Sequence, residues 1–173
     1  DSIASTYIAQ SNVYRFRQGK FEAEDAILTS GVVSIKSFWA GSRKYVIIGN
    51  AFGLKSTRDP GVVVVYEHLQ GKLYQRQELD GFTGLTDVAY FHSNGAEWLV
   101  MTTDPLLAGS SLQGASTIYS WDTSNCTTSE TLCQDVVDFT FHRRFNCTGC
   151  SSATHFESAG DNHYVVSASA TAL

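Results

Sequence analysis

Three short runs of consecutive apolar residues recur along the chain, each directly after a polar turn. The runs occupy positions 45–48, 98–101 and 164–166 and consist of β-branched, aromatic and aliphatic residues. Such residues favour a pleated strand, and a strand that is apolar at every position is usually buried on both faces. The pattern therefore predicts three strands, each enclosed between two layers. Sustained helical periodicity is absent from the sequence.

A longer template surrounds each of these runs. Segment 31–38 aligns with 84–91 and with 149–156, and each copy opens on Gly and ends on Phe. The turns that follow include Ser-Asn-Gly and Ala-Gly-Asp, which are typical of hairpins. The second half of the template is therefore two strands joined by a tight turn.

The first half of the template precedes these strands in each copy. Segment 14–21 (YRFRQGKF) aligns with 66–73 (YEHLQGKL), and Tyr119 starts the third copy. One copy thus holds about four short strands in about 50 residues, which fits one blade of a β-propeller. We predict an all-β chain that is one β-propeller segment of about three four-stranded repeats, at about 1–53, 54–106 and 107–173.

The template resembles the EAR repeat, also called the epitempin or EPTP repeat, over about residues 12–167. The copies differ where the second has Asp87, because the first has Ser34 and the third has Ser152. The third copy also carries an insertion. The second copy matches best, with these residues in the expected order: Tyr66, Gly71-Lys72, Gln77, Leu79, Gly84, Asp87-Val88, Phe91 and Trp98-Leu99-Val100.

This resemblance implies an extracellular protein similar to the leucine-rich glioma-inactivated proteins and the thrombospondin-type laminin G proteins with EAR repeats. Repeats of that family form seven-bladed propellers that act as protein-binding platforms, and no catalytic residue set belongs to it. The position of Asp87 is structural there, with a carboxylate that accepts backbone N–H bonds from a neighbouring turn. We therefore expect a non-catalytic module in adhesion, matrix or receptor–ligand contact.

Three repeats do not close a seven-bladed ring, and an open propeller exposes sheet edges that invite aggregation. We expect the chain to be part of a longer polypeptide or of a multi-chain propeller. In the second case two chains make a six-bladed ring, and each end of one chain supplies a strand to the other. The start at Asp1, without an apolar leader, fits a processed chain and a fragment equally. A β-trefoil, which three copies would close, is the alternative fold, although the Gln-x-Trp signature of ricin-type trefoils is missing.

All four cysteines lie in the inserted segment of the third repeat, near 126–150. An even number in one segment indicates local disulfides, with three pairings open. We expect Cys126–Cys133 with Cys147–Cys150 first, and the nested pairs Cys126–Cys150 and Cys133–Cys147 second. The Cys147-x-x-Cys150 spacing also admits a redox pair or half a zinc site, although its flanks show no helical pattern.

Two N-glycosylation sequons overlap the cysteines, at Asn125 and Asn146. A sequon used in the cell must lie on the surface of a secreted protein. Sequons and clustered cysteines point to the same compartment. They predict a secreted glycoprotein with disulfide bonds.

Charge narrows the set of partners. The net charge is −5 and basic residues form no cluster beyond pairs such as Arg143-Arg144, which argues against nucleic acid and anionic membranes. The longest aliphatic run, 62–65, is far too short to span a bilayer. Scattered carboxylates, Glu67 and Glu97 among them, are interpreted as a solvated face. We expect no catalytic residues, no metal ligand set and no cofactor, with structural calcium bound by loop oxygens left open.

Two tryptophans are the candidate binding residues, Trp39 and Trp121. Aromatic side chains often anchor protein interfaces, and the alternative interpretation of both is packing between blades. The expected partner is an extracellular receptor or matrix protein. The alternative function is a secreted carbohydrate-binding, lectin-like module, in which aromatic faces stack on a glycan. A secreted enzyme on the same scaffold would need carboxylates that converge in the channel.

Overall fold

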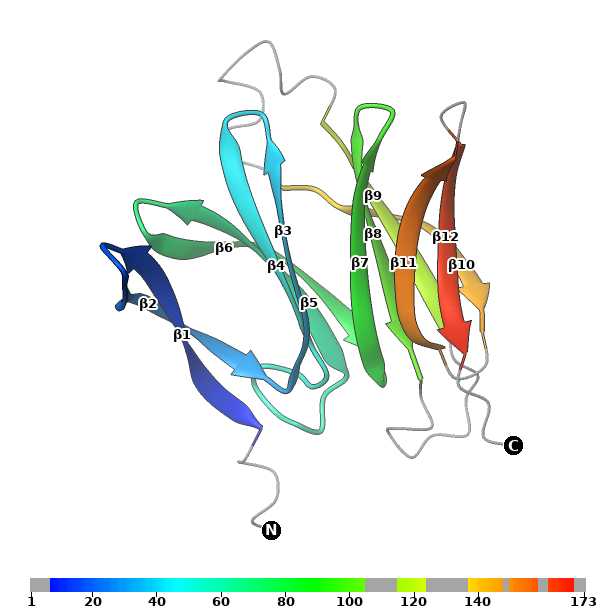
Figure 1. The fold of residues 1–173 in the computed structure, drawn as a ribbon. Helices are drawn as coiled ribbons and strands as arrows, with labels where there is room; N and C mark the ends of the chain where they lie inside the picture. The colour runs from blue at the N-terminus through cyan, green and yellow to red at the C-terminus, as the bar shows by residue number, and fades with distance from the viewer. Residues whose placement is uncertain (1–6, 105–114, 124–136, 148–149, 159–161, 170–173) are drawn as a thin grey trace.

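The computed structural model describes residues 7–104, 115–123, 137–147, 150–158 and 162–169, with residue 158 and 162–169 described as backbone. All regular elements in these ranges are antiparallel β-strands (Figure 1), which confirms the all-β prediction. The strands are β1 (Ile8–Arg17), β2 (Lys20–Ser30), β3 (Val32–Ala40), β4 (Arg43–Asn50), β5 (Gly61–Leu69), β6 (Lys72–Phe82), β7 (Leu85–Ser93), β8 (Ala96–Thr103), β9 (Ala115–Asp122), β10 (Thr140–Asn146), β11 (Cys150–Ser158) and β12 (Asn162–Ser169).

The strands form two complete four-stranded sheets flanked by two half-sheets. In β3–β6 and in β7–β10 every strand pairs with the next one along the chain. The first half-sheet is β1–β2 and the second is β11–β12. Figure 1 shows these two pairs on opposite sides of the complete sheets.

The sheets and the sequence repeats are out of phase. Sheet β3–β6 takes β3 and β4 from the first repeat and β5 and β6 from the second, and β7–β10 joins the second repeat to the third. We call β3–β4, β7–β8 and β11–β12 leading pairs, and β1–β2, β5–β6 and β9–β10 trailing pairs. A complete sheet is one leading pair followed by one trailing pair. One sequence repeat therefore contributes to two sheets.

The same backbone irregularity recurs in all three trailing pairs. The register between the paired strands shifts directly before Tyr14, Tyr66 and Tyr119. Such a shift is a β-bulge, an extra residue on one strand that bends it and increases its twist. The three leading pairs also share a bulge, at Val33, Thr86 and Ser151. The repeated sequence template thus produces a repeated backbone.

Neighbouring sheets stack through equivalent aromatic rings. Tyr90 of β7 stacks on Phe38 of β3, with ring centroids 4.8 Å apart. His155 of β11 stacks on Phe91 of β7 at 4.2 Å. His155 therefore fills the place of Tyr90 in the third repeat, as the alignment predicts. β3 packs beside β7 and β7 beside β11, so the sheets follow one another in sequence order.

Polar side chains tie the first strands of neighbouring sheets together. The hydroxyl of Ser34 on β3 donates to the carbonyl of Val88 on β7 (3.2 Å). The carboxylate of Asp87 on β7 accepts the N–H of Ala153 on β11 (3.3 Å). Asp87 thus has the structural role expected from the resemblance. The N–H that it accepts from outside its own strand belongs to the next sheet and not to a turn.

The outer strands are linked by a second set of equivalent bonds. The carboxylate of Asp25 on β2 accepts the N–H of Leu73 on β6 (2.7 Å). The amide of Gln77 on β6 donates to the carbonyl of Phe139 and accepts its N–H, both at 2.9 Å. Phe139 directly precedes β10, so each link joins one trailing pair to the next.

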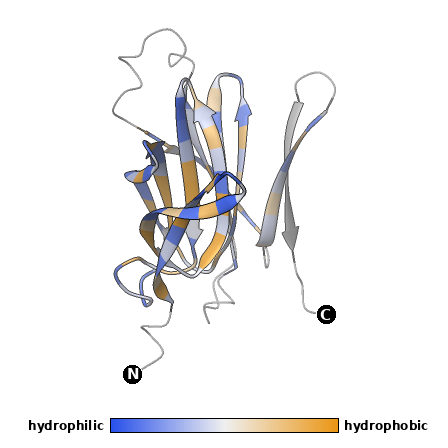
Figure 2. Cartoon of the chain, turned by 60° about the vertical axis from the view of Figure 1, so that its left-hand side comes forward, coloured by the Kyte–Doolittle hydropathy of each residue, from blue (hydrophilic) through white to orange (hydrophobic). Residues whose placement is uncertain are grey.

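The main core lies between the two complete sheets. Its members come from both and include two rings of the aromatic stack, Phe38 and Tyr45, with Trp121 and Phe139 facing them. Figure 2 shows the apolar and polar positions alternating along the strands. Smaller clusters fill the spaces toward β1–β2 and toward β11–β12.

Candidate binding surface at the hairpin end of the sheets

The β3–β4 and β7–β8 hairpins lie at the same end of the stack, the upper end in Figure 1. The β7–β8 turn uses Asn94 and Gly95, both with positive φ (52° and 72°). This backbone matches the right-handed twist of the flanking strands and explains the Asn-Gly sequence. Both turns are short, so they hold nearby side chains in fixed positions.

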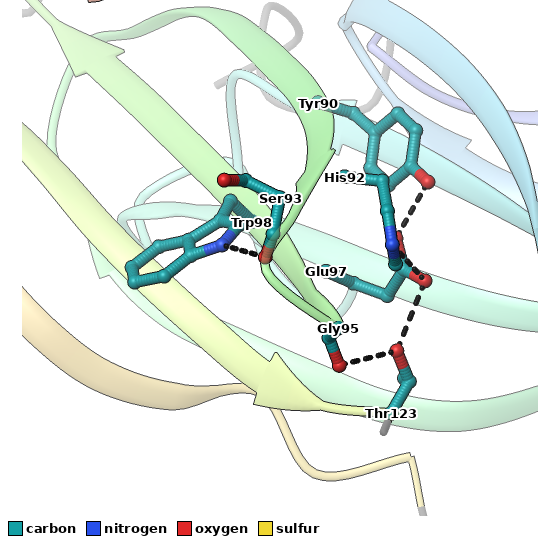
Figure 3. A network of polar contacts seen from close by, with 7 residues as sticks. All are labelled: Tyr90, His92, Ser93, Gly95, Glu97, Trp98 and Thr123. Carbon is teal, nitrogen blue, oxygen red and sulfur yellow. Dashed lines mark hydrogen bonds and ion pairs between the residues drawn. The ribbon is translucent and has the colours of Figure 1, made fainter. Parts of the chain in front are cut away.

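A buried glutamate holds the β7–β8 hairpin against the end of β9 (Figure 3). Glu97 is 2% exposed, and it accepts hydrogen bonds from the hydroxyls of Tyr90 (2.6 Å) and Thr123 (3.2 Å). The Nδ1 atom of His92 lies 3.0 Å from the same carboxylate. Thr123 also bonds the carbonyl of Gly95 through its N–H and its hydroxyl. These contacts fix the hairpin tip relative to the sheet.

Burial and the contact with Glu97 keep the phenol of Tyr90 protonated. Burial raises the pKa of Tyr90 far above its ordinary value, and the hydrogen bond to Glu97 and its negative charge raise it further. The phenol is therefore protonated at neutral pH and donates its hydrogen bond to Glu97. Tyr90 thus links the stack on Phe38 to the hairpin end.

A second buried glutamate holds the other complete sheet at the same end. Glu67 on β5 is 3% exposed, and its carboxylate bonds Nη1 of Arg43 (3.0 Å) and the guanidinium of Arg76 through Nε (2.7 Å) and Nη2. Burial, with the negative charge of Glu67, raises the pKa of neighbouring Tyr45. Two cations around one carboxylate compensate its desolvation.

The interpretation of these carboxylates as a solvated face is wrong for Glu67 and Glu97. Each lies two residues along its strand from an apolar residue that points into the main core. These residues are Val65 for Glu67 and Leu99 for Glu97. Every second residue along a strand points to the same face, so a residue two positions from a core residue lies on the core side as well. The sequence signal that could have identified the two buried glutamates is their two-residue spacing from these apolar residues.

The structure separates the two candidate tryptophans. Trp121 is 6% exposed and packs edge-on against Tyr45 at 5.6 Å, so it belongs to the core. Trp39 is 63% exposed at the end of β3, beside the β3–β4 hairpin. The ammonium of Lys44 lies 5.9 Å from its ring centroid. Trp39 therefore presents a ring and a positive charge to solvent, and Trp121 does not.

A cavity of about 750 Å³ lies at the opposite end of the sheets. Its lining includes the bulge residues of all three leading pairs together with Arg58 and Asp59 of the β4–β5 loop. Thr86 fills a structural role there, because its hydroxyl bonds the carbonyls of Cys150 (2.6 Å) and Thr102 (3.1 Å). The cavity thus lies where the sheets meet.

One disulfide is described, between Cys147 and Cys150, with Cα atoms 5.9 Å apart. The first of the two predicted pairings is confirmed for this pair, and the nested alternative is wrong. Cys150 starts strand β11, so the pair does not open a helix as a redox motif would. Asn146 is exposed at the end of β10, as an acceptor must be. Cys126, Cys133 and Asn125 lie outside the described residues.

The described residues show neither a cluster of metal-ligating side chains nor a membrane-spanning helix. Within the described ranges, His, Cys, Asp and Glu side chains do not gather in threes that could hold a metal ion. The same ranges contain no helix with the length and apolar character needed to cross a membrane.

Neither the protein-family models nor the curated proteins contain one that matches this chain.

Proposed function

We propose that the chain is an extracellular protein-binding module whose sheets are blades of an EAR-type β-propeller. Antiparallel four-stranded meanders that stack in sequence order through equivalent contacts are typical of propeller blades. The sheets stay separate in the described ranges, which favours blades over a trefoil. The Cys147–Cys150 disulfide and the exposed Asn146 support the secretory compartment.

The exposure of the Trp39 ring is the observation that supports the binding role. A large aromatic ring that is 63% exposed is costly to leave in water, and aromatic rings anchor many protein interfaces. The ring sits on a strand next to a short hairpin, so little conformational entropy is lost when a partner contacts it. Lys44 beside the ring adds a positive charge that favours an acidic partner surface.

Binding is proposed over catalysis because the buried carboxylates already have partners. Glu67 is held by two guanidinium groups, and Glu97 by hydroxyl groups and an imidazole. Each has a structural role at a sheet end. A glycan partner would have to stack on Trp39, because the ring of Trp121 is in the core.

Cell-surface binding tests this function. The chain, biotinylated and tetramerised on streptavidin, is applied to cells of the source organism that were first treated with protease or with glycosidase. We expect protease treatment to abolish binding and glycosidase treatment to leave it. The reverse result would favour the lectin-like function, and equal binding to all cells would contradict both.

A matched pair of variants locates the contact. Trp39→Ala is expected to reduce binding about tenfold or more. Tyr74→Ala, which removes a 44% exposed ring from the outer strand β6, is expected to leave binding unchanged. Equal losses in both variants would contradict the placement of the contact at the hairpin end.

A further inference from the structure

We propose that a second copy of this chain completes the terminal sheets, with β12 of one copy paired antiparallel to β1 of the other. This inference deepens the proposed function, because it rests on the interpretation of the sheets as propeller blades. The composite sheet would have the order β11–β12–β1–β2, with the first pair from one copy and the second pair from its partner.

The two half-sheets are complementary. Among the described strands, β11–β12 is a leading pair without a trailing pair, and β1–β2 is a trailing pair without a leading pair. In the complete sheets the joint is made by β4 with β5 and by β8 with β9. The equivalent joint is β12 with β1. One chain thus contains both halves of one further sheet.

Positions that a neighbouring sheet buries inside the stack are exposed at the ends of the stack. Phe38 and Phe91 are 4% and 8% exposed, and Phe156 at the equivalent place is 47% exposed. On the opposite side, Ile35 is 61% exposed, whereas its counterpart Val88 is fully buried beneath β3. Phe156 and Ile35 therefore mark the two faces that a neighbouring sheet would cover.

An apolar groove occupies the place of the missing leading pair. It has a volume of about 330 Å³ and lies between β1–β2 and the sheet β3–β6. Its floor and walls include Val13, Ile27, Ile35, Val46 and Ile48. The side chains come from both sides of the space that a leading pair fills in a complete stack. The groove thus has the apolar character that a β11–β12 hairpin would bury.

The described β11–β12 pair does not lie in the groove of its own molecule. In Figure 1 the β11–β12 pair stands on the far side of the two complete sheets from β1–β2. The β11–β12 pair of a second copy has the strand order that this place in the stack requires. A head-to-tail contact of this kind closes into a ring when the rotation between copies allows it. Two copies would give a ring of six sheets, which is within the usual range of propellers.

The complete sheets also fix the register of the proposed joint. In the β4–β5 pairing, Val46 faces Tyr66 and Ile48 faces Val64. The bulges place Tyr14 at the position of Tyr66, and the leading-pair registers place Val165 at the position of Val46. The joint would therefore pair Val165 with Tyr14 and, two residues along each strand, Ser167 with Asn12.

The proposed joint leaves the binding surface open. The equivalent of Trp39 in the next leading pair is His92, because each directly follows the Phe that ends its aligned segment. The side chain of His92 is 57% exposed although a sheet covers that face of β7. Trp39 is therefore expected to stay accessible in the two-copy ring.

Native mass spectrometry of the 173-residue chain at micromolar concentration tests the proposal. We expect the mass of two copies. A monomer alone, or an open series of larger assemblies, would overturn it.

A cysteine pair tests the register. Asn12→Cys with Ser167→Cys should give a covalent dimer on a non-reducing gel, because the two residues face each other in the proposed joint. The control is Asn12→Cys with Val166→Cys, which is shifted by one residue so that the side chains point to opposite faces. Dimer in the first variant and not in the control supports the joint. Equal yields, or no covalent dimer in either, would overturn it.

The two proposals fail in different ways. A monomer that still binds protease-sensitive sites on cells would remove the two-copy joint and leave the proposed function. A two-copy mass without such binding would remove the proposed function and leave the joint. Trp39→Ala is expected to leave the two-copy mass unchanged.

Discussion

The interface between the two complete sheets and the two ends of the stack are built from the same positions of one template, yet their burial differs. Phe38 is enclosed by Tyr45, Tyr90 and Trp121, whereas Phe156 is half-exposed. The side chain is the same, and its place relative to the opposite strand is the same. The comparison shows that burial in this fold is supplied by the next sheet and not by the strand itself.

Polar links follow the same rule. The side chains of Ser34 and Asp87 each bond the backbone of the first strand in the next sheet, at Val88 and Ala153. Asp25 and Gln77 do the same between outer strands. Each sheet therefore carries side chains whose partners lie on its neighbour, which is the property expected of a unit in a stack.

The largest effect is expected from deleting the ring at the centre of the stack. Phe38→Ala should lower the free energy of unfolding by about 4 kcal/mol, because it leaves a cavity between the sheets. Phe156→Ala should cost about 1 kcal/mol or less in dilute protein, since the ring is half-exposed there. Urea unfolding of both variants measures the difference. Equal losses would break the comparison between centre and end.

The next largest effect concerns the buried carboxylate of Glu67. Glu67→Ala leaves Arg43 and Arg76 without their shared anion, and we expect a loss of about 3 kcal/mol. Glu78→Ala on the neighbouring strand β6 is the control, because its carboxylate bonds an exposed amide of Gln75. Thermal unfolding of the two variants checks the ranking. A control that loses as much as Glu67→Ala would contradict the buried role.

The link between the outer strands should come third. Gln77→Ala leaves the backbone N–H and carbonyl of buried Phe139 without their side-chain partner, at a cost of about 2 kcal/mol. Gln77→Glu keeps an acceptor for the N–H and loses the donor to the carbonyl, so it should fall between Gln77→Ala and the parent. Urea midpoints give the order. A Gln77→Glu variant as stable as the parent would show that the donor half of the link contributes nothing.

The smallest effect depends on pH. The backbone N–H of Leu73, followed by that of Ala26, lowers the pKa of Asp25. A carboxyl whose folded pKa lies below its unfolded one contributes stability above the unfolded pKa, and this stability disappears as the pH falls through the folded pKa. The parent should therefore lose stability below about pH 4, and Asp25→Asn should lose less over that range. Urea midpoints between neutral and acidic pH measure both slopes. Identical slopes would contradict the role of Asp25.

Much of this fold could be predicted from the residues. The aligned copies predicted strands in all three repeats and the equivalence of His155 with Tyr90, because apolar parity and turn residues are local signals. The pairing of half of one repeat with half of the next could not be predicted, since alignment gives the period and not the phase of the sheets. The sequence period is the same whichever of the four strands is taken as the first strand of a sheet.

The candidate site was predicted in part. An exposed Trp and a core Trp both appear as an aromatic residue at a strand end, and their difference depends on which sheet lies opposite. Trp121 faces Tyr45 across the main core, whereas Trp39 points away from it. The burial of Glu67 likewise depends on Arg43 and Arg76, which reach it from two neighbouring strands.

The most direct test of the repeated stacking is a pair of double-mutant cycles. Phe38 with Tyr90 and Phe91 with His155 should each show a coupling energy of about 1 kcal/mol in urea unfolding, as stacked rings do. The exchanged pair, Phe38 with His155, should show coupling near zero. Coupling in the exchanged pair equal to that in the stacked pairs, or no coupling in either stacked pair, would contradict a stack of equivalent sheets.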